Sequence, residues 1–246
     1  MDDFPRIRPV GLDGLLVSFA DRLAEPANRA ALAFRAAVDR AGWDGVEETA
    51  TSLVSTYVRL DPLAEAKGIE AKLAELLADR DWREEPLPQG RTLWRIPTVF
   101  GGQAGPQLAE AAARAGLEEA EAIRQLSTTR LRVQTIGFAP GQPYLGVLPE
   151  AWDIPRQEAL TDKVPVGAVT VAIRQIVLFA APSPTGWRQV GRTAFRAFRP
   201  EAEDPFLLRP GDEVEFTAAE RLPDGPDGGA ELNNELPFKF QTISLF

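Results

Sequence analysis

The chain has 246 residues, 44% of them hydrophobic, so it is long enough to bury one large core or two ordinary ones. It contains no Cys and no His, which excludes disulfides, thiol nucleophiles and Ser-His-Asp or Cys-His catalytic sets, and disfavours the usual zinc sites. Its net charge of −9 argues against wholesale binding of a nucleic-acid backbone.

Membrane and export signals are missing from the sequence. No apolar run approaches the roughly 20 residues needed to span a bilayer. The first residues, MDDFPRIRP, lack the basic and apolar regions of a signal peptide. We therefore expect a cytoplasmic protein that has no membrane partner.

The first part of the chain alternates strand and helix patterns. Short apolar or alternating runs predict strands, and apolar residues at helical spacing predict helices between them. The order is βαββαβ, which is typical of a ferredoxin-like domain in an α+β protein. The expected elements are a strand at 15–19, a helix at 26–41, strands at 46–50 and 52–60, a helix at 63–77 and a strand at 92–96.

The middle of the chain changes character twice. A glycine-rich turn at 101–105 precedes two short helices, at about 106–127, which are broken at Gly116. A DNA-binding helix-turn-helix is disfavoured, because acidic residues near the start of the second helix would repel phosphates. From residue 129, short Val-, Ile- and Phe-rich segments separated by Pro and Gly predict a barrel or a sandwich.

The last segment, 219–246, has two parts. LPDGPDGGAELNNE is rich in Gly, Pro, Asp and Asn, and we expect it to be mobile. The final ten residues, PFKFQTISLF, are apolar enough to dock, either as a last barrel strand or as a partner-binding peptide.

Charge and motifs narrow the chemistry without deciding it. Between Thr129 and Arg199, nine Lys and Arg face four Asp and Glu, which fits either a cleft for a small anion or a solvated surface. Neither GxxxxGK[ST] nor GxGxxG after a strand is present, so no nucleotide-binding loop is predicted. Ser183 has no identifiable base, which argues against a catalytic serine.

The segment GFAPGQPYLGVLPE, residues 137–150, holds three glycines and three prolines around Tyr144. Proline fixes φ and glycine reaches positive φ, so this segment should be a stiff, shaped loop. Such a loop would hold backbone amides and Tyr144 in place at the mouth of a barrel and limit the entropy lost on binding.

Several segments together resemble one family. They are GFAPGQPYLGVL, Pro155-Arg156, VPVGAVTVA at 164–172, SPTGW at 183–187, GRT at 191–193 and LLRPGDEVEF at 207–216. In order and spacing they resemble the family of the B subunit of 5-oxoprolinase. That family includes allophanate hydrolase subunit 1, the carboxyltransferase domain of urea carboxylase and the sporulation kinase inhibitor of bacilli. The resemblance covers most of the chain up to Phe216.

The resemblance implies an architecture and an activity. The architecture is a ferredoxin-like part at 1–97, a cyclophilin-like β-barrel at 98–218, and the tail at 219–246. The activity is ATP-dependent hydrolysis of 5-oxoproline to glutamate, by a complex with a homologous C-subunit-like protein and an A-subunit-like protein. ATP would be bound here or by a partner. Two alternatives stay open: a carboxyltransferase that uses biotin carried by a partner, and a non-catalytic regulator such as a histidine kinase inhibitor.

Residues inside these segments are the candidate site for a small amide or carboxylate substrate. No catalytic residue and no metal ligand is assigned. Each candidate also has a structural reading, because Arg can tie loops to carbonyls and a loop Tyr can simply pack over a rim. The substrate-binding candidates are Tyr144, Arg156, Arg192 and Thr193. The loop-scaffold candidates are Gly137, Phe138, Pro140, Gly141, Pro143, Gly146, Pro165, Gly167, Ser183, Pro184, Gly186, Trp187 and Gly191.

The chain also departs from the pattern of the family it resembles. It lacks an expected His, acid, Arg and Tyr, and a PGFPYLGG-type segment is altered at two positions. The departures allow either a changed substrate or a binding protein without chemistry. They fall at Gln107, Leu126-Ser127, Gln142, Val147, Leu160-Thr161 and Phe179-Ala180.

Overall fold

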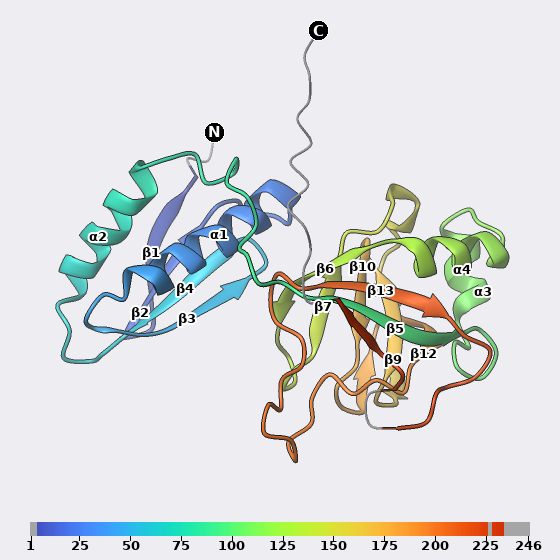
Figure 1. Ribbon diagram of the computed structural model, residues 1–246. Helices are drawn as coiled ribbons and strands as arrows, with labels where there is room; N and C mark the ends of the chain where they lie inside the picture. Colours follow the sequence, from blue (N-terminus) through green and yellow to red (C-terminus); the bar gives the residue numbers. More distant parts are fainter. Residues whose placement is uncertain (1–3, 226–227, 234–246) are drawn as a thin grey trace, which may run out of the picture.

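The computed structural model describes residues 4–225 and 228–233, which form a mixed α+β structure with four α-helices and a closed seven-stranded barrel. Figure 1 shows two lobes, one ending at α2 and the other beginning at β5. The elements are β1 (Arg6–Val10), β2 (Gly14–Ser18), α1 (Glu25–Ala41), β3 (Val46–Ser52), β4 (Ser55–Leu60), α2 (Ala66–Ala78), β5 (Leu93–Phe100), α3 (Leu108–Arg114), α4 (Glu119–Thr128), β6 (Leu131–Ile136), β7 (Pro143–Gly146), the 3-10 turn η1 (Glu150–Trp152), β8 (Thr161–Val164), β9 (Ala168–Ala172), β10 (Gln175–Leu178), β11 (Ser183–Thr185), β12 (Arg188–Arg192), β13 (Glu213–Ala218) and β14 (Glu231–Asn233).

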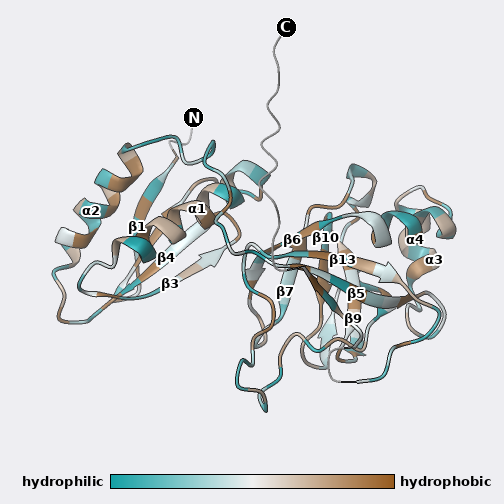
Figure 2. Cartoon of the chain, in the orientation of Figure 1, coloured by the Kyte–Doolittle hydropathy of each residue, from teal (hydrophilic) through white to brown (hydrophobic). Residues whose placement is uncertain are grey.

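The N-terminal lobe packs α1 and α2 on an antiparallel sheet of order β1-β2-β4-β3. In Figure 2 both helices carry hydrophilic and hydrophobic residues, as amphipathic helices on a sheet do. Helix α1 ends at Gly42, whose φ of 54° lets its N–H bond the carbonyl of Val38. Phe34 is fully buried against the Trp82 ring, with centroids 5.0 Å apart. The predicted elements from 15–19 to 63–77 are therefore confirmed.

The last strand of the predicted βαββαβ unit does not belong to the N-terminal sheet. The strand predicted at 92–96 exists as β5, but it belongs to the barrel, and β1 occupies the free edge beside β2. Sequence reasoning missed β1 because RIRPV is basic and largely exposed, and Pro9 is tolerated only on an edge strand. The ferredoxin-like assignment is thus not confirmed. The boundary at residue 97 falls inside β5, and the division into domains stays a prediction.

The second lobe is the barrel predicted from residue 129 onward. Its strands close in the order β5-β12-β9-β10-β7-β6-β13 and back to β5, with β13 and β5 parallel. The barrel core is made of inward-facing aliphatic side chains, and α3 and α4 add Leu108 and Leu126 to it. The two helices separate at Gly116, which has a φ of 69°. The cyclophilin-like assignment of this barrel stays a prediction.

Polar contacts from α1 join the two lobes. The Asn28 side chain donates to the carbonyls of Leu53 at 2.5 Å and Gln134 at 3.2 Å. Arg132 of β6 pairs with Glu25 at 3.1 Å; burial lowers the pKa of Arg132, whereas Glu25 acts in the opposite direction. The barrel strand β6 is therefore held directly against the N-terminal lobe.

The described part of the C-terminal segment lies on the barrel. Strand β14 pairs antiparallel with β5, so residues 231–233 extend the barrel sheet, and the mobility of this segment stays a prediction. A Cβ on Gly228 would lie 2.2 Å from the backbone nitrogen of Phe195, so the chain passes close to the barrel there. The apolar stretch 237–246 lies outside the described residues. No helix in the described part of the chain is long and apolar enough to cross a membrane.

Candidate functional site

A cavity of about 180 Å³ lies between the loop before β7, the loop before β8 and the turn between β11 and β12. Six of its lining residues are candidates from the sequence: Phe138, Tyr144, Arg156, Pro184, Gly186 and Trp187. The remaining lining residues are Gln142, Leu160, Val177, Phe179 and Thr185. The structure therefore brings residues from four separate segments to one place.

The Gly- and Pro-rich loop forms one wall of the cavity. It closes on itself through the Gly137 N–H, which donates to the Gln142 carbonyl, and the Gln142 N–H, which donates to the Ala139 carbonyl, both at 3.1 Å. Gly141 has a φ of 68°, and a Cβ there would lie 2.9 Å from the Cβ of Phe198. Only glycine suits this position. The second half of the loop, predicted as irregular, is strand β7, which pairs with β6 and β10.

Aromatic rings form the floor of the cavity. The Tyr144 and Trp187 rings meet edge to face, with centroids 6.1 Å apart. Trp187 belongs to a small buried cluster with Val177 and Phe179. The Arg156 guanidinium lies 5.2 Å above the centre of the Trp187 ring, a cation–π contact. The cavity thus combines an apolar floor with one cation at its edge.

The backbone around Arg156 is clamped by buried polar contacts. The Arg188 guanidinium donates to the Pro155 carbonyl at 2.6 Å, and the Gln157 N–H donates to the Gly186 carbonyl at 2.7 Å. The Gln157 side chain also donates to the Trp187 carbonyl at 3.1 Å. These bonds fix the backbone on both sides of Arg156, whose guanidinium forms no hydrogen bond with any described residue.

Helix α3 extends this network from outside the cavity. Gln107, just before α3, donates to the Gln157 side-chain oxygen at 2.5 Å and accepts from the Gln189 N–H at 2.8 Å. Glu110 accepts from the buried Arg188 at 2.9 Å, and this contact, followed by Arg114, lowers the pKa of Glu110. Sequence reasoning missed this network, because most of its contacts join residues 29 to 82 positions apart.

Three polar side chains of the cavity have no hydrogen-bond partner among the described residues: Gln142, Tyr144 and Arg156. Gln142 is the most unusual, since only 1% of its surface is exposed and its Oε1 is fully buried. Buried polar side chains are normally hydrogen-bonded. Gln142 is therefore the cavity-lining side chain whose burial is least explained by contacts within the described residues.

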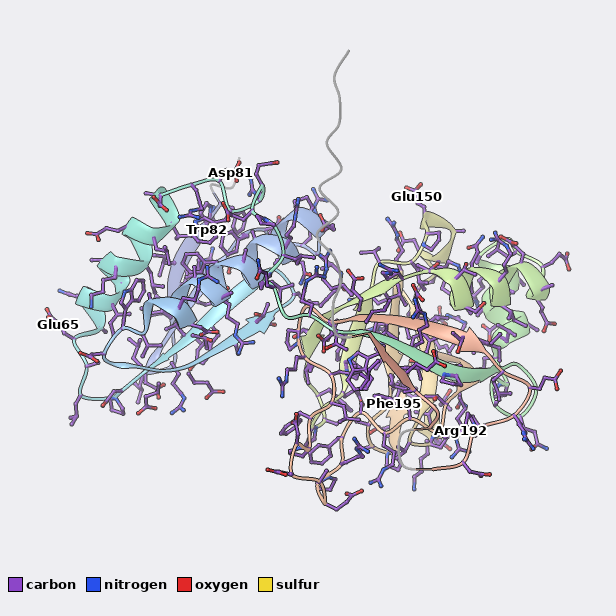
Figure 3. All side chains as sticks on the ribbon, in the orientation of Figure 1. Glu65, Asp81, Trp82, Glu150, Arg192 and Phe195 are labelled. Atoms are coloured by element: carbon purple, nitrogen blue, oxygen red, sulfur yellow. The ribbon has the colours of Figure 1, made fainter. Side chains whose placement is uncertain are left out.

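Arg192 and Thr193 lie away from this cavity. Arg192 ends β12, about 16 Å along the strand from Trp187 at the usual rise per residue. In Figure 3 it lies at the lower end of the barrel, opposite Glu150. Thr193 is buried, and its hydroxyl accepts from the Phe195 N–H at 3.0 Å. The roles of Arg192 and Thr193 in substrate binding stay predictions. The bond to Phe195 gives the Thr193 hydroxyl a structural role.

The other scaffold candidates hold the barrel. Gly167 has a φ of 78°, and a Cβ there would lie 2.1 Å from the Thr193 carbonyl oxygen. Gly146 leaves room for the side chain of Gln134, which accepts from Gln175 at 2.7 Å. Gly191 lies against the backbone of β5. Pro165 makes the turn before β9, Pro140 is exposed on the opening loop, Pro143 begins β7, and Ser183 is a residue of β11.

Most of the basic side chains of residues 129–199 are held by contacts within the chain. Five arginines donate to Glu side chains or backbone carbonyls, and Arg199 also has a partner. Among described residues, Arg156, Lys163 and Arg192 make no hydrogen bond or ion pair. Of these three, Arg156 alone lines the cavity. Three positions that depart from the family's pattern, Gln142, Leu160 and Phe179, line it as well.

The family follows from a match to the model described as "Carboxyltransferase domain, subdomain C and D", which covers residues 5–208. The chain belongs to this family. Among curated relatives, it is 40% identical to the 5-oxoprolinase B subunit of Escherichia coli O157:H7 over 56% of this chain and 63% of that protein. It is 28% identical to the 5-oxoprolinase B subunit of Bacillus subtilis (strain 168) over 86% of this chain and 91% of that protein. The chain thus matches less than two thirds of the E. coli relative.

Solved structures share the fold. The protein TTHA0988 is 33% identical, with a TM-score of 0.70 over 90% of this chain and 41% of its own. Kluyveromyces lactis urea carboxylase is 16% identical, with a TM-score of 0.67 over 92% of this chain and 24% of its own. The second likeness shows the fold alone. The family assignment expected from the motifs is therefore confirmed.

Proposed function

We propose that the chain is a component of a 5-oxoprolinase-type amidohydrolase, which hydrolyses 5-oxoproline to glutamate with ATP. It would act with a homologous C-subunit-like protein and an A-subunit-like protein. The observation that carries the proposal is the match to 91% of the length of a 5-oxoprolinase B subunit. The named relatives are subunits, which supports an enzyme of several chains.

The cavity suits a compact, anionic substrate. At about 180 Å³ it is smaller than the roughly 300–1,000 Å³ of pockets for drug-sized molecules. Arg156 supplies a guanidinium that can hold a carboxylate with two parallel hydrogen bonds. The aromatic floor of Tyr144 and Trp187 would exclude water from one face of the substrate.

ATP does not fit this cavity. The sequence has no GxxxxGK[ST] loop, and the cavity is too small for a nucleoside triphosphate and has one cation, Arg156, among its lining residues. We therefore place ATP on a partner protein. The runner-up function, transfer of a carboxyl group from biotin carried by a partner, is favoured by the name of the matching family.

The rim of the cavity is a suitable place for the partner. Phe138 is 75% exposed and Leu160 is 64% exposed, and both line the opening. Large apolar side chains beside a pocket mark a surface that another molecule covers. We propose that the C-subunit-like partner closes the cavity there and supplies the reacting groups that this chain lacks.

Reconstitution tests the proposal. The chain is co-expressed with C-subunit-like and A-subunit-like proteins, and glutamate formed from 5-oxoproline and ATP is measured. Turnover that disappears when this chain is omitted is the expected result. A well-formed complex without turnover would contradict the proposal and favour the carboxyltransferase or a regulatory binding role.

Arg156→Ala should lower kcat/KM for 5-oxoproline by about 10- to 100-fold, mainly through KM, since a charge-assisted hydrogen bond contributes about 1.5–3 kcal/mol. Arg192→Ala tests the rival candidate: it removes an exposed arginine outside the cavity, and it should change kcat/KM less than about twofold if the cavity is the substrate site. Steady-state kinetics of the reconstituted complex decide the matter. Equal losses in both variants, or a loss confined to Arg192→Ala, would move the anion site to the other end of the barrel.

A further inference from the structure

Gln142 is a polar residue in an apolar setting. It follows the left-handed Gly141 and precedes β7, and its backbone is held at both its N–H and its carbonyl by the turn. Its side chain lines the same cavity as Val177 and Phe179. The loop therefore fixes the backbone from which the side-chain amide extends.

The amide of Gln142 has hydrogen-bonding capacity that no described residue uses. Oε1 is buried without a partner, and no hydrogen bond joins Nε2 to a described residue. Leaving a buried polar atom unpaired is unfavourable. Because Oε1 has almost no accessible surface, a ligand in the cavity pairs with the full amide only when the side chain turns toward it, and that pairing would satisfy the amide.

The side-chain amide of Gln142 indicates which hydrogen-bonding groups such a ligand would carry. A primary amide presents one acceptor and two donors in a plane, which matches the N–H and C=O of another amide. Arg156, at the edge of the same cavity, matches a carboxylate. We propose that Gln142 is a specificity-determining residue that recognises the amide of a small amide-containing carboxylic acid whose carboxylate is held by Arg156. This inference rests on the proposed function and deepens it.

Analogues that lack either the amide or the carboxylate test the contacts of Gln142 and Arg156 separately. The full-length chain is titrated with 5-oxoproline, with cyclopentanecarboxylate, which lacks the amide, and with 2-pyrrolidone, which lacks the carboxylate. Calorimetry should show 5-oxoproline binding about tenfold more tightly than either analogue, because a site that hydrogen-bonds a polar group rejects the analogue without it. Equal affinity for 5-oxoproline and cyclopentanecarboxylate, or no saturable binding of any probe, would overturn the inference.

Gln142→Leu tests the residue itself. The variant should bind 5-oxoproline and cyclopentanecarboxylate equally, and without ligand its Tm should be unchanged or about 2–4 °C higher, since no bond is lost. A purely structural Gln142 would lower the Tm instead. Gln142→Met, unbranched and of similar length, repeats the test if the leucine does not fold. Gln103→Leu, at an exposed position, is the control and should keep the discrimination.

A spectroscopic signature completes the test. The side-chain amide signal of Gln142 is assigned in a nitrogen–proton correlation spectrum by its loss in Gln142→Leu, and it should shift on addition of 5-oxoproline but not of cyclopentanecarboxylate. Discrimination that persists in both Gln142 variants would overturn the inference, while reconstituted turnover would leave the proposed function intact. Discrimination by the chain without turnover in the complex would contradict the proposed function alone.

Discussion

Replacing Gly105 with alanine should destabilise the protein by about 4 kcal/mol, because overpacking against a rigid backbone is among the few mechanisms with effects this large. A Cβ at this position would lie 2.0 Å from the carbonyl oxygen of Val190 in β12. The turn and the strand are bound together, since the Gly101 N–H donates to that same carbonyl at 3.1 Å. The added methyl group must therefore break the contact between turn and barrel.

Thermal unfolding measures the effect. A loss of about 4 kcal/mol corresponds to a Tm lower by roughly 8–16 °C in a chain of this size. Gly137→Ala is the matched control, because a Cβ there meets nothing within 4 Å and its φ is not positive, so its Tm should be nearly unchanged. Similar Tm values for the two variants would show that the turn at 101–105 can move away from β12.

Arg188→Ala should cost about 3 kcal/mol and lower the Tm by roughly 6–12 °C. Only 2% of Arg188 is exposed, and it links Glu110 at 2.9 Å to the Pro155 carbonyl at 2.6 Å. The substitution leaves that carbonyl unpaired and opens a cavity behind the loop that carries Arg156. Binding of 5-oxoproline should weaken too, because Arg156 loses its fixed backbone.

Arg114→Ala is the control for Arg188→Ala, since Arg114 pairs with the same Glu110 at 3.0 Å but is half exposed. Exposed pairs of this spacing contribute about 0.3–0.5 kcal/mol, so its Tm should change by no more than about 2 °C. Equal losses from the two substitutions would contradict a special role for the buried arginine.

The pH dependence of the Tm tests the role of Arg188 in a second way. Arg188, more than Arg114, holds the pKa of Glu110 below its usual 4.5. A carboxyl whose pKa is lower in the folded than in the unfolded chain stabilises the fold at pH values above its unfolded-state pKa. This stabilisation is lost as the pH falls through the folded-state pKa. The Tm difference between wild type and Arg188→Ala should therefore narrow at pH values below about 4. A difference that is constant from pH 7 to pH 3 would show that only packing is lost.

The sequence predicts local structure better than strand pairing. Helix α1 and the β3–β4 pair follow from periodicity and from stop signals such as Gly42. The partner of β5 does not, because a short apolar strand looks the same in an N-terminal sheet and in a barrel. A local pattern contains no information on which distant strand will pair with it.

The sequence likewise predicts some residues of the candidate site and misses others. Tyr144 and Trp187 are found from their Gly- and Pro-rich surroundings and Arg156 from the resemblance to the family, and the three do meet at one cavity. Gln142 is visible in the sequence only as a departure from a pattern, since its unpartnered burial is a three-dimensional property. Arg188 looks like any strand arginine until its contact with Pro155, 33 positions away, is seen.

The most direct test of the central claim is a crystal structure of the assembled complex grown with 5-oxoproline and without ATP. We predict density for the compound between Gln142, Tyr144 and Arg156, with its carboxylate on the guanidinium and its ring against Trp187. Density confined to a partner protein, or to the end of the barrel near Arg192, would contradict the assignment of the substrate site to this cavity.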